Sequence, residues 1–317
     1  MAAVPQKLLL ASPRGYCAGV DRAVQTVERA LDLYGAPVYV RKEIVHNKHV
    51  VEELRTRGAV FVDSETEVPE GATVVFSAHG VAPSVHANAR ARGLQTIDAT
   101  CPLVTKVHVE AKKFAAESYT IVLVGHNGHE EVEGTMGEAP EHIVLIETVE
   151  DVDRLEVADP TRVAYISQTT LSVDETNAII NRLRERFPAI IGPRTDDICY
   201  ATTNRQAAVK QLARECDLVL VIGSSNSSNS NRLVEVAREH GAAAHLIDNE
   251  LHVEEEWLSG MRVVGITSGA SAPEELVQRL VEFFRARGCS DVEELEVIEE
   301  DVRFMLPKAI RQAMATA

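Results

Sequence analysis

The chain has 317 residues, which at roughly 150 residues per domain corresponds to about two domains. Hydrophobic residues make up 45% and charged residues 25% of the sequence, the balance of an ordinary soluble globular protein. The formal net charge of −16 argues against a protein that binds nucleic acids or anionic membranes in general, because such proteins need a basic face. It does not exclude a small anionic ligand held in a locally neutral pocket.

Neither a membrane segment nor a disulfide framework is predicted. The first residues, MAAVPQKLLLAS, contain a hydrophobic run too short for a signal peptide, and no apolar stretch approaches the ~18 residues that cross a bilayer. The cysteines are odd in number and no pair has CxxC spacing. We therefore expect a cytoplasmic protein with reduced thiols. The cysteines are Cys17, Cys101, Cys199, Cys216 and Cys289.

Short apolar runs rich in β-branched residues recur along the chain, and most are followed by a polar loop and an amphipathic helix. Continuous apolar runs that alternate with helices are typical of buried parallel strands, so we predict an α/β fold with mainly parallel, four-stranded sheets. The expected strands form three sets: 7–12, 37–40, 59–62 and 73–78; then 94–98, 119–125, 142–147 and 162–167; then 189–191, 217–223, 243–248 and 262–267.

The three sets share an internal pattern. In each, the first strand leads into a cysteine loop that opens a helix, in the segments RGYCAGVDRAV, DATCPLVTKV and DDICYATTNRQAAV. This recurrence favours three similar α/β units over two domains, with boundaries at 1–93, 94–188 and 189–317. The last unit includes an acidic C-terminal tail, 291–301, which we expect to be solvated. Parallel strands present ligand residues at their carboxyl ends, so three converging units would direct their cysteines into one cavity.

Cys17, Cys101 and Cys199 hold equivalent positions, each between a strand end and a helix N-terminus, where the helix dipole favours a thiolate. Three thiolates facing one cavity suit a soft metal or an iron–sulfur cluster with one open coordination position. A single cysteine is more often a buried packing residue, but the threefold placement favours ligands. Cys216 and Cys289 lack this placement and are expected to pack in the core.

Polar loops after other strands indicate an anion pocket and acid–base chemistry. His46 and His79 each follow a strand and precede a helix, where an imidazole can bind an anion or relay a proton. His129 lies in GHNGHEEVEGTMG beside several glutamates, which suits general acid–base catalysis and equally a solvated acidic loop. The Ser- and Asn-rich stretch 224–231 favours oxyanion binding. Ser271 has capping-box spacing, which is compatible with anion binding.

These segments, in their order along the chain, resemble the LytB family of 4-hydroxy-3-methylbut-2-enyl diphosphate reductases. The resemblance rests on PRGYCAGVDRAV, EIVHNKHVV, FSAHGVAP, DATCPLVTKVH, GHNGHEEVEGTMGE, SQTTLSVDET, DICYATTNRQ, GSSNSSNSNRL and TSGASAPE. It runs from about residue 12 to 290. Departures are small, such as Tyr16 where the family usually has Phe.

The resemblance implies three α/β domains with pseudo-threefold symmetry around a central 4Fe–4S cluster, held by Cys17, Cys101 and Cys199 with one iron open to the substrate hydroxyl. The implied reaction removes this hydroxyl as water with two electrons and two protons. Its products are isopentenyl and dimethylallyl diphosphate, at the last step of the methylerythritol phosphate route to isoprenoids. The implied partners are the allylic diphosphate substrate and an electron donor such as ferredoxin or flavodoxin.

The resemblance also implies roles for individual residues. Glu131 would deliver a proton near the reacting carbon, Thr169 would contact the substrate hydroxyl and help the relay, and His129 would act beside them. The substrate-binding residues would be His46, His79, His129, Thr169, Ser227, Ser228, Asn229 and Ser271. Two alternatives stay open: a zinc protein with a three-cysteine site, and a non-enzymatic binder of phosphorylated metabolites.

Overall fold

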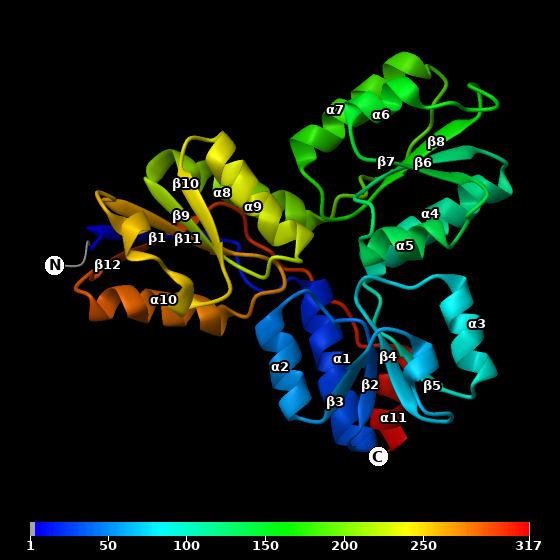
Figure 1. Cartoon of the computed structure of the whole chain (residues 1–317), viewed down its shortest axis with the longest axis horizontal. Coiled ribbons are helices and arrows are strands. Elements are labelled where there is room, and N and C mark those ends of the chain that lie inside the picture. Colours follow the sequence, from blue (N-terminus) through cyan, green and yellow to red (C-terminus); the bar gives the residue numbers. More distant parts are fainter. Residues whose placement is uncertain (1–3, 317) are drawn as a thin grey trace. The chain divides into compact units, whose positions relative to one another are not determined.

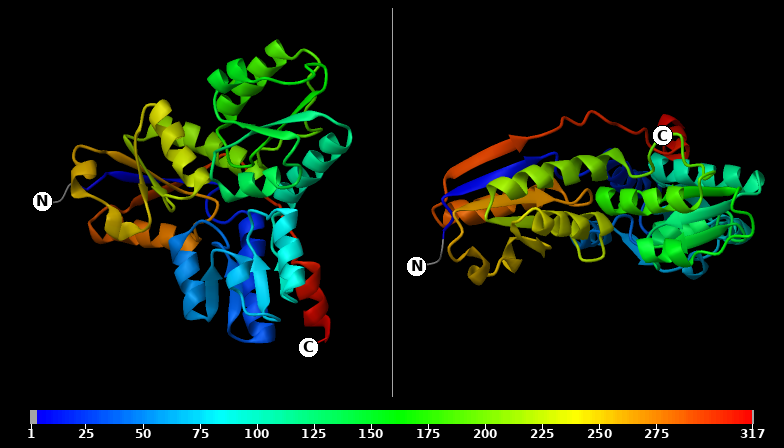
Figure 2. Two further views of the ribbon diagram at one scale, coloured as in Figure 1. Left: turned by 45° about the vertical axis from the view of Figure 1, so that its right-hand side comes forward. Right: turned by 90° about the horizontal axis from the view of Figure 1, so that it is seen from above.

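The computed structural model describes residues 4–316 (Figures 1 and 2). Contacts along the chain divide it into two compact units. Unit 1 contains the described chain up to Val20, together with His46–Glu52 and Tyr200–Arg303. Unit 2 contains Asp21–Val45, Glu53–Cys199 and the described chain from Phe304 onward. Every strand pairing in the three sheets is parallel, which confirms the predicted α/β class.

Unit 1 is built on one five-stranded sheet covered by helices on both faces. In sheet order the strands are β10 (Ala243–Ile247), β9 (Leu218–Ile222), β11 (Val263–Ser268), β1 (Lys7–Ser12) and β12 (Asp291–Glu296). Its main helices are α8 (Tyr200–Glu215), α9 (Ser228–Glu239) and α10 (Glu274–Ala286). Figure 1 shows α8 and α9 along one side of this sheet and α10 along the other.

Alternate residues of the same strands form two separate cores, one on each face of this sheet. Leu8 and Leu10 of β1 pack in the core that contains Phe284 of α10. Leu9 lies in the opposite core with Leu212 of α8. Because β1 is buried on both faces, its sequence reads as an unbroken apolar run rather than an alternating one.

Unit 2 contains two smaller parallel sheets. The four-stranded sheet has the order β3 (Ala59–Val62), β2 (Val38–Arg41), β4 (Thr73–Phe76) and β5 (Gln95–Asp98). The three-stranded sheet has the order β7 (Ile143–Ile146), β6 (Thr120–Val124) and β8 (Val163–Ser167). A single bridge between Ala164 and Ile191 extends it beyond β8.

The remaining helices connect these strands. They are α1 (Ala18–Tyr34), α2 (Lys48–Thr56), α3 (Pro83–Ala91), α4 (Pro102–Ala116), α5 (Glu130–Met136), α6 (Val149–Arg154), α7 (Val173–Arg186) and α11 (Lys308–Thr316), with short 3₁₀ turns at Glu65–Glu67, Glu250–His252 and Glu255–Leu258. Among residues 4–316, none of the helices has the length and apolarity that crossing a membrane requires.

The strand that opens each predicted set pairs outside that set, which corrects the expected grouping. The strand at 7–12 pairs with β11 and β12, and the strand at 95–98 pairs with β4. Ile191 bridges to β8 in the same way. Hence the sheets have five, four and three strands rather than four each. Apolar periodicity identifies a buried strand but carries no signal for which neighbour it joins. The boundaries at residues 93 and 188 remain predictions.

The acidic segment after residue 290 is not a solvated tail throughout. Its first part is β12, which lies at the sheet edge beside β1 (Figure 2, right). Val292 and Leu295 pack against the two cores, while the glutamates between them face outward. Lys7 binds Glu293 at 2.6 Å. Charged residues on an edge strand discourage pairing with other chains, which explains why a strand here has a tail-like composition.

We predict that Phe284→Ala lowers the stability of unit 1 by about 3–5 kcal/mol, because it removes a large side chain from a filled core. Phe284 is 0% exposed at the centre of its core. Urea-induced unfolding followed by circular dichroism measures the loss. Leu251→Ala is the control, since Leu251 is 81% exposed. Equal midpoints for the two variants would contradict this account of the core.

Candidate active site

The three cysteines predicted as ligands share one local structure. Cys17, Cys101 and Cys199 are each half-buried and immediately precede α1, α4 and α8. The backbone N–H of each donates a hydrogen bond to a carbonyl in a neighbouring loop. The acceptors, in the same order, are Ala270 O at 3.2 Å, Ala78 O at 2.9 Å and Thr169 O at 3.0 Å. All cysteines of the chain lie within the described residues, and none forms a disulfide.

These hydrogen bonds connect cysteines to loops that the expected grouping of strands kept apart. That grouping placed Ser271 with Cys199, in the set of strands from 189 to 267, whereas the structure ties the loop of Ser271 to Cys17. The reason is the strand exchange described above, because β1 runs into Cys17 and lies beside β11, which runs into the loop of Ser271. Parallel neighbours end at the same edge, so their following loops meet. The other two pairs are Cys101 with the loop of His79, and Cys199 with Thr169.

In unit 2, a buried carboxylate is bonded at both oxygens to one threonine. Glu131 is 2% exposed and Thr169 is 4% exposed. The Thr169 N–H donates to Glu131 Oε1 at 2.7 Å, and the Thr169 hydroxyl donates to Glu131 Oε2 at 3.0 Å. The backbone bond fixes the carboxylate, and the hydroxyl bond gives it a partner through which a proton can pass.

His129 caps α5, the helix that carries Glu131. Its Nδ1 accepts a hydrogen bond from the Glu131 N–H at 3.1 Å. An Nδ1 that accepts is unprotonated, so the ring proton of neutral His129 lies on Nε2. The cap therefore assigns the tautomer and makes Nε2 a hydrogen-bond donor.

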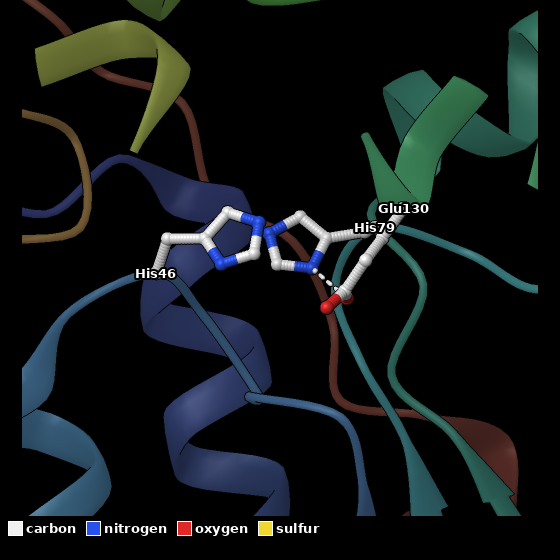
Figure 3. Close-up of side chains that lie close together, drawn as sticks. All are labelled: His46, His79 and Glu130. Carbon is white, nitrogen blue, oxygen red and sulfur yellow. Dashed lines mark hydrogen bonds and ion pairs between the residues drawn. The ribbon is translucent and has the colours of Figure 1, made fainter. Parts of the chain in front are cut away.

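His79 lies beside this helix start. Figure 3 shows its ring directed at Glu130, and His79 Nδ1 is 3.1 Å from Glu130 Oε2. The rings of His79 and His129 meet edge to face with centroids 5.9 Å apart. A carboxylate at one nitrogen of an imidazole orients the ring and stabilises its charged form.

Two glycines, Gly134 of α5 and Gly137 at its C-cap, allow this helix to approach the loop of His79. A Cβ on Gly137 would lie 2.3 Å from the Cβ of Ala82, and one on Gly134 would lie 3.3 Å from the carbonyl of Gly80. No other residue type leaves this space, so the glycines bring the two histidines and Glu131 into one part of unit 2.

In unit 1, the start of α9 is tightly built around Ser230. Its backbone N–H and hydroxyl both donate to the Ser227 hydroxyl, at 3.3 and 3.0 Å. A Cβ on Gly223 or on Gly269 would lie 2.3 or 2.0 Å from Ser230 Oγ. The helix start is therefore locked between the loops that follow β9 and β11. The predicted Ser- and Asn-rich loop is thus a rigid structure rather than a linker.

Asn229, the residue before Ser230 in this helix start, is 5% exposed. Within residues 4–316, neither its amide oxygen nor its amide nitrogen has a hydrogen-bond partner. A buried amide without partners costs about 1–3 kcal/mol, so such groups need an explanation. A ligand that accepts from the amide nitrogen gives one. This side chain is the strongest structural indication of a binding site in unit 1.

The other predicted anion ligands of unit 1 lie near this helix. Ser228 is half-buried in the first turn of α9. The Ser271 hydroxyl donates to the backbone carbonyl of His46 at 2.9 Å, and the Asn226 amide lies 3.4 Å from His46 Nδ1. Ser271 therefore positions His46 instead of capping a helix, since Pro273 is the cap of α10.

The predicted site residues thus divide into two groups. Unit 1 contains Cys17 and the predicted anion ligands His46, Ser227, Ser228, Asn229 and Ser271. Unit 2 contains Cys101 and Cys199 together with His79, His129, Glu131 and Thr169. Sequence reasoning missed Ser230, although it lies in the serine-rich segment that was singled out. It also missed Gln168, whose side chain accepts from the His126 N–H at 3.0 Å.

A buried charge cluster near Cys199 also escaped prediction. Asp197 accepts from the Ser167 N–H at 2.9 Å and pairs with Lys106 at 3.0 Å. Burial raises the pKa of Glu110 to about 7, and the adjacent Asp197 carboxylate contributes to the shift. At neutral pH the two carboxyl groups therefore share less than two negative charges.

The comparisons with known proteins agree with the predicted resemblance. A family model described as LytB protein matches residues 8–285. The chain belongs to the LytB family. Its relatives include the 4-hydroxy-3-methylbut-2-enyl diphosphate reductase of Nocardia farcinica, 62% identical over 96% of this chain and 91% of that protein. The same enzyme of Cutibacterium acnes is 60% identical over 100% of this chain and 98% of that protein.

Solved structures of LytB relatives confirm the fold of this member. The E-1-hydroxy-2-methyl-but-2-enyl-4-diphosphate reductase of Plasmodium falciparum matches with a TM-score of 0.96 and 37% identity, over 98% of this chain and 99% of that one. The structure of (E)-4-hydroxy-3-methyl-but-2-enyl diphosphate reductase, described as the terminal enzyme of the non-mevalonate pathway, matches with a TM-score of 0.63 and 32% identity. It covers 88% of this chain and 99% of that one.

We predict that Glu110→Gln makes stability less dependent on pH between about 4.5 and 7. The native pKa of Glu110 is about 7 against an ordinary value of 4.5, so the folded chain binds more protons than the unfolded chain in this range. Wild-type stability therefore falls as pH rises through it, and the variant lacks this contribution. Thermal unfolding at both ends of the range tests this. Glu141→Gln, at an exposed carboxyl, is the control, and parallel curves for all three proteins would contradict the prediction.

Proposed function

We propose that this LytB family member is a 4-hydroxy-3-methylbut-2-enyl diphosphate reductase. The reaction replaces the allylic hydroxyl by hydrogen, consuming two electrons and two protons and releasing water. The products are isopentenyl and dimethylallyl diphosphate, the end products of the non-mevalonate route. The observation that carries the proposal is the buried Glu131–Thr169 pair, whose threonine also accepts the backbone hydrogen bond of Cys199. In unit 2, the residues proposed to deliver protons are therefore hydrogen-bonded to a proposed cluster ligand.

The cysteines suit an iron–sulfur cluster by the chemistry of their donors. Cys17, Cys101 and Cys199 are half-buried thiols outside any disulfide, each at the start of a helix. Three thiolates around a 4Fe–4S cluster leave one iron without a protein ligand. When bound, the cluster would supply the electrons and a Lewis-acidic site for the substrate oxygen. Three units arranged with pseudo-threefold symmetry around this cluster belong to the same proposal.

The residues of unit 1 suit the diphosphate. Ser227, Ser228 and Asn229 would offer hydroxyl and amide donors, and His46 would offer an imidazole, without a magnesium ion. Ser271, whose hydroxyl donates to the His46 carbonyl in this structure, would join them by turning that hydroxyl to the diphosphate. The unpartnered Asn229 amide supports this assignment most directly. His79 and His129 would add imidazole donors from unit 2, and the tautomer of His129 directs its Nε2–H outward from the helix cap.

The acid–base residues suit a two-step relay. In the structure the Thr169 hydroxyl donates to Glu131 Oε2. Once Glu131 carries a proton this bond reverses, so that Oε2–H gives its proton to Thr169 Oγ1 while the threonine gives its own proton to the leaving hydroxyl. The Thr169 N–H holds the carboxylate in place during the exchange. His129 fixes the start of the same helix. In this proposal Glu131 and Thr169 move the protons, and His129 binds substrate beside them.

The electrons come from an external donor. A two-electron reduction at an iron–sulfur cluster proceeds by single-electron transfers, so ferredoxin or flavodoxin is the proposed partner class. The deciding experiment is anaerobic purification, followed by analysis of iron, sulfide and zinc and by turnover of the hydroxylated diphosphate with reduced methyl viologen. Iron, sulfide and turnover together support the proposal. Zinc without sulfide would favour the three-cysteine zinc protein, and metal-free diphosphate binding would favour a non-enzymatic binder.

We predict that Glu131→Gln retains the cluster and substrate binding but loses most turnover. The amide keeps the shape of the side chain and an acceptor for the Thr169 N–H, but it holds no transferable proton. The loss is expected to be on the order of 10²–10⁴-fold in kcat. Viologen-driven turnover and substrate affinity are measured on the same preparation. Turnover near the wild-type rate would exclude proton delivery by Glu131, and Glu133→Gln, on the same helix, is the control.

We predict that Asn229→Leu weakens substrate binding and does not destabilise the substrate-free protein. Leucine has a similar volume and removes two buried polar atoms that lack partners in the described chain. Losing a hydrogen bond to a charged group should weaken binding by roughly 10–100-fold. Substrate affinity is compared with thermal unfolding of the substrate-free protein. Unchanged affinity would remove Asn229 from the pocket.

A further inference from the structure

Each helix that begins after a predicted cysteine ligand carries a cationic side chain five or six residues beyond that cysteine. Arg22 lies five residues after Cys17, Lys106 lies five after Cys101, and Arg205 lies six after Cys199. All three cations donate hydrogen bonds to backbone carbonyls within the four residues before one of the other cysteines. These contacts have no part in the proposed chemistry, and no sequence pattern singled the residues out.

Arg22 of α1 holds the loop of Cys101. Its Nη1 donates to the carbonyls of Ala99 and Thr100, both at 2.9 Å. Its Nε donates to the carbonyl of Met305 at 2.8 Å, so the chain near the C-terminus holds the guanidinium from another side. Burial lowers the pKa of Arg22, whereas nearby negative charge at Asp98 and Cys101 favours its charged form. The contacts place one cation against the two residues that precede the thiol.

Lys106 of α4 holds the loop of Cys199 in the same manner. Its ammonium group donates to the carbonyls of Thr195 and Asp196 and to Asp197 Oδ1, the last two at 3.0 Å. Asp197 is itself fixed by the Ser167 N–H at 2.9 Å, at the end of β8. One lysine thus binds three consecutive residues that end two positions before the cysteine.

Arg205 of α8 holds the loop of Cys17. It is 0% exposed, and its Nη2 donates to the carbonyl of Gly15 at 2.8 Å. Its Nη1 donates to the carbonyl of Ala201 at 3.0 Å and pairs with Glu300 at 3.1 Å. Glu300 also accepts from the Asn204 amide at 3.0 Å. A fully buried arginine is costly unless paired. The hydrogen bonds of Arg205 to the two carbonyls and its ion pair with Glu300 have to offset that cost.

The contacts run in a closed cyclic order. The helix after Cys17 holds the loop of Cys101, the helix after Cys101 holds the loop of Cys199, and the helix after Cys199 holds the loop of Cys17. We propose that Arg22, Lys106 and Arg205 are positioning residues that hold the three cysteine loops ready for the cluster. This inference rests on the proposed function, because it needs the three cysteines to be cluster ligands.

The physical reason is twofold. Carbonyls that precede a helix start have no partner within the helix, and a charged donor binds them more strongly than a neutral one. Positive charge beside each loop also offsets the negative charge of the bound thiolates. Partners that orient metal ligands commonly change metal affinity by roughly 10–100-fold when they are removed. The three cations are therefore expected to affect cluster retention more than overall stability.

The test uses the full chain reconstituted anaerobically with iron and sulfide. Arg22→Met and Lys106→Met remove the cations that bind the loops of Cys101 and Cys199, and Arg22→Lys and Lys106→Arg keep a cation at each position. Arg205 is too buried to replace safely, so Glu300→Gln is used to weaken its ion pair instead. The control is Arg182→Met, because Arg182 is a half-exposed cation of α7 that binds Asp153 and Glu185. The readouts are iron and sulfide per chain, the rate of iron release to a chelator, the electron paramagnetic resonance spectrum of the reduced cluster, and thermal unfolding of the cluster-free chain.

We expect iron release to be roughly 10–100-fold faster in Arg22→Met and Lys106→Met, with altered resonance spectra. Glu300→Gln should lie between these and wild type, and Arg22→Lys and Lys106→Arg should recover most of the loss. Release rates within twofold of wild type, or equal acceleration in Arg182→Met, would overturn the inference. So would release rates that merely follow the unfolding temperature of the cluster-free chain. A wild-type chain that takes up no iron and sulfide would instead defeat the proposed function.

Discussion

Neighbouring parallel strands have their carboxyl ends at the same edge of a sheet. In this chain each of the three predicted cysteine ligands follows such an end and is hydrogen-bonded to the loop after a neighbouring strand. The strand before a cysteine lies beside the strand before a polar loop, and the cysteine N–H then reaches a carbonyl of that loop. One kind of backbone hydrogen bond, made three times, therefore fixes where the thiols stand relative to His79, Thr169 and the loop of Ser271. The residues proposed for acid–base chemistry and those proposed to bind the anion both depend on these edges.

The sequence predicted the elements of the fold better than their partners. The strand Leu218–Ile222 is buried at every position, as its unbroken apolar run predicted. The partner of the strand at 7–12 could not be predicted, because hydrophobic runs look alike wherever they pair. The strand Asp291–Glu296 was missed for a different reason. An edge strand is only partly buried on either face, so the charged residues of this strand hid its two apolar positions.

The same distinction applies to the site. Motifs identified Glu131 and Thr169 separately, but only the folded chain joins them at both carboxylate oxygens. Asn229 was predicted as one amide among several polar residues, whereas its burial without partners could not be read from its neighbours. Arg205 gave no signal at all, because an arginine in a helix is usually solvated and this one is fully buried. Residues that act through long-range contacts are the ones that local patterns omit.

The position of β1 between β11 and β12 sets an order of assembly during synthesis. Of the strands in this sheet β1 is synthesised first, yet its two partners, β11 and β12, begin at residues 263 and 291. Likewise, the Cys17 N–H can make its hydrogen bond only after Ala270 has been synthesised. The loop of Cys17 can be bound only after Arg205 and its ion-pair partner Glu300 have been synthesised. Pairings between residues so far apart form late and slowly. Cys17 therefore lacks its final contacts until the chain through Glu300 has been synthesised, so an iron–sulfur cluster bound by all three cysteines could be completed only after that point.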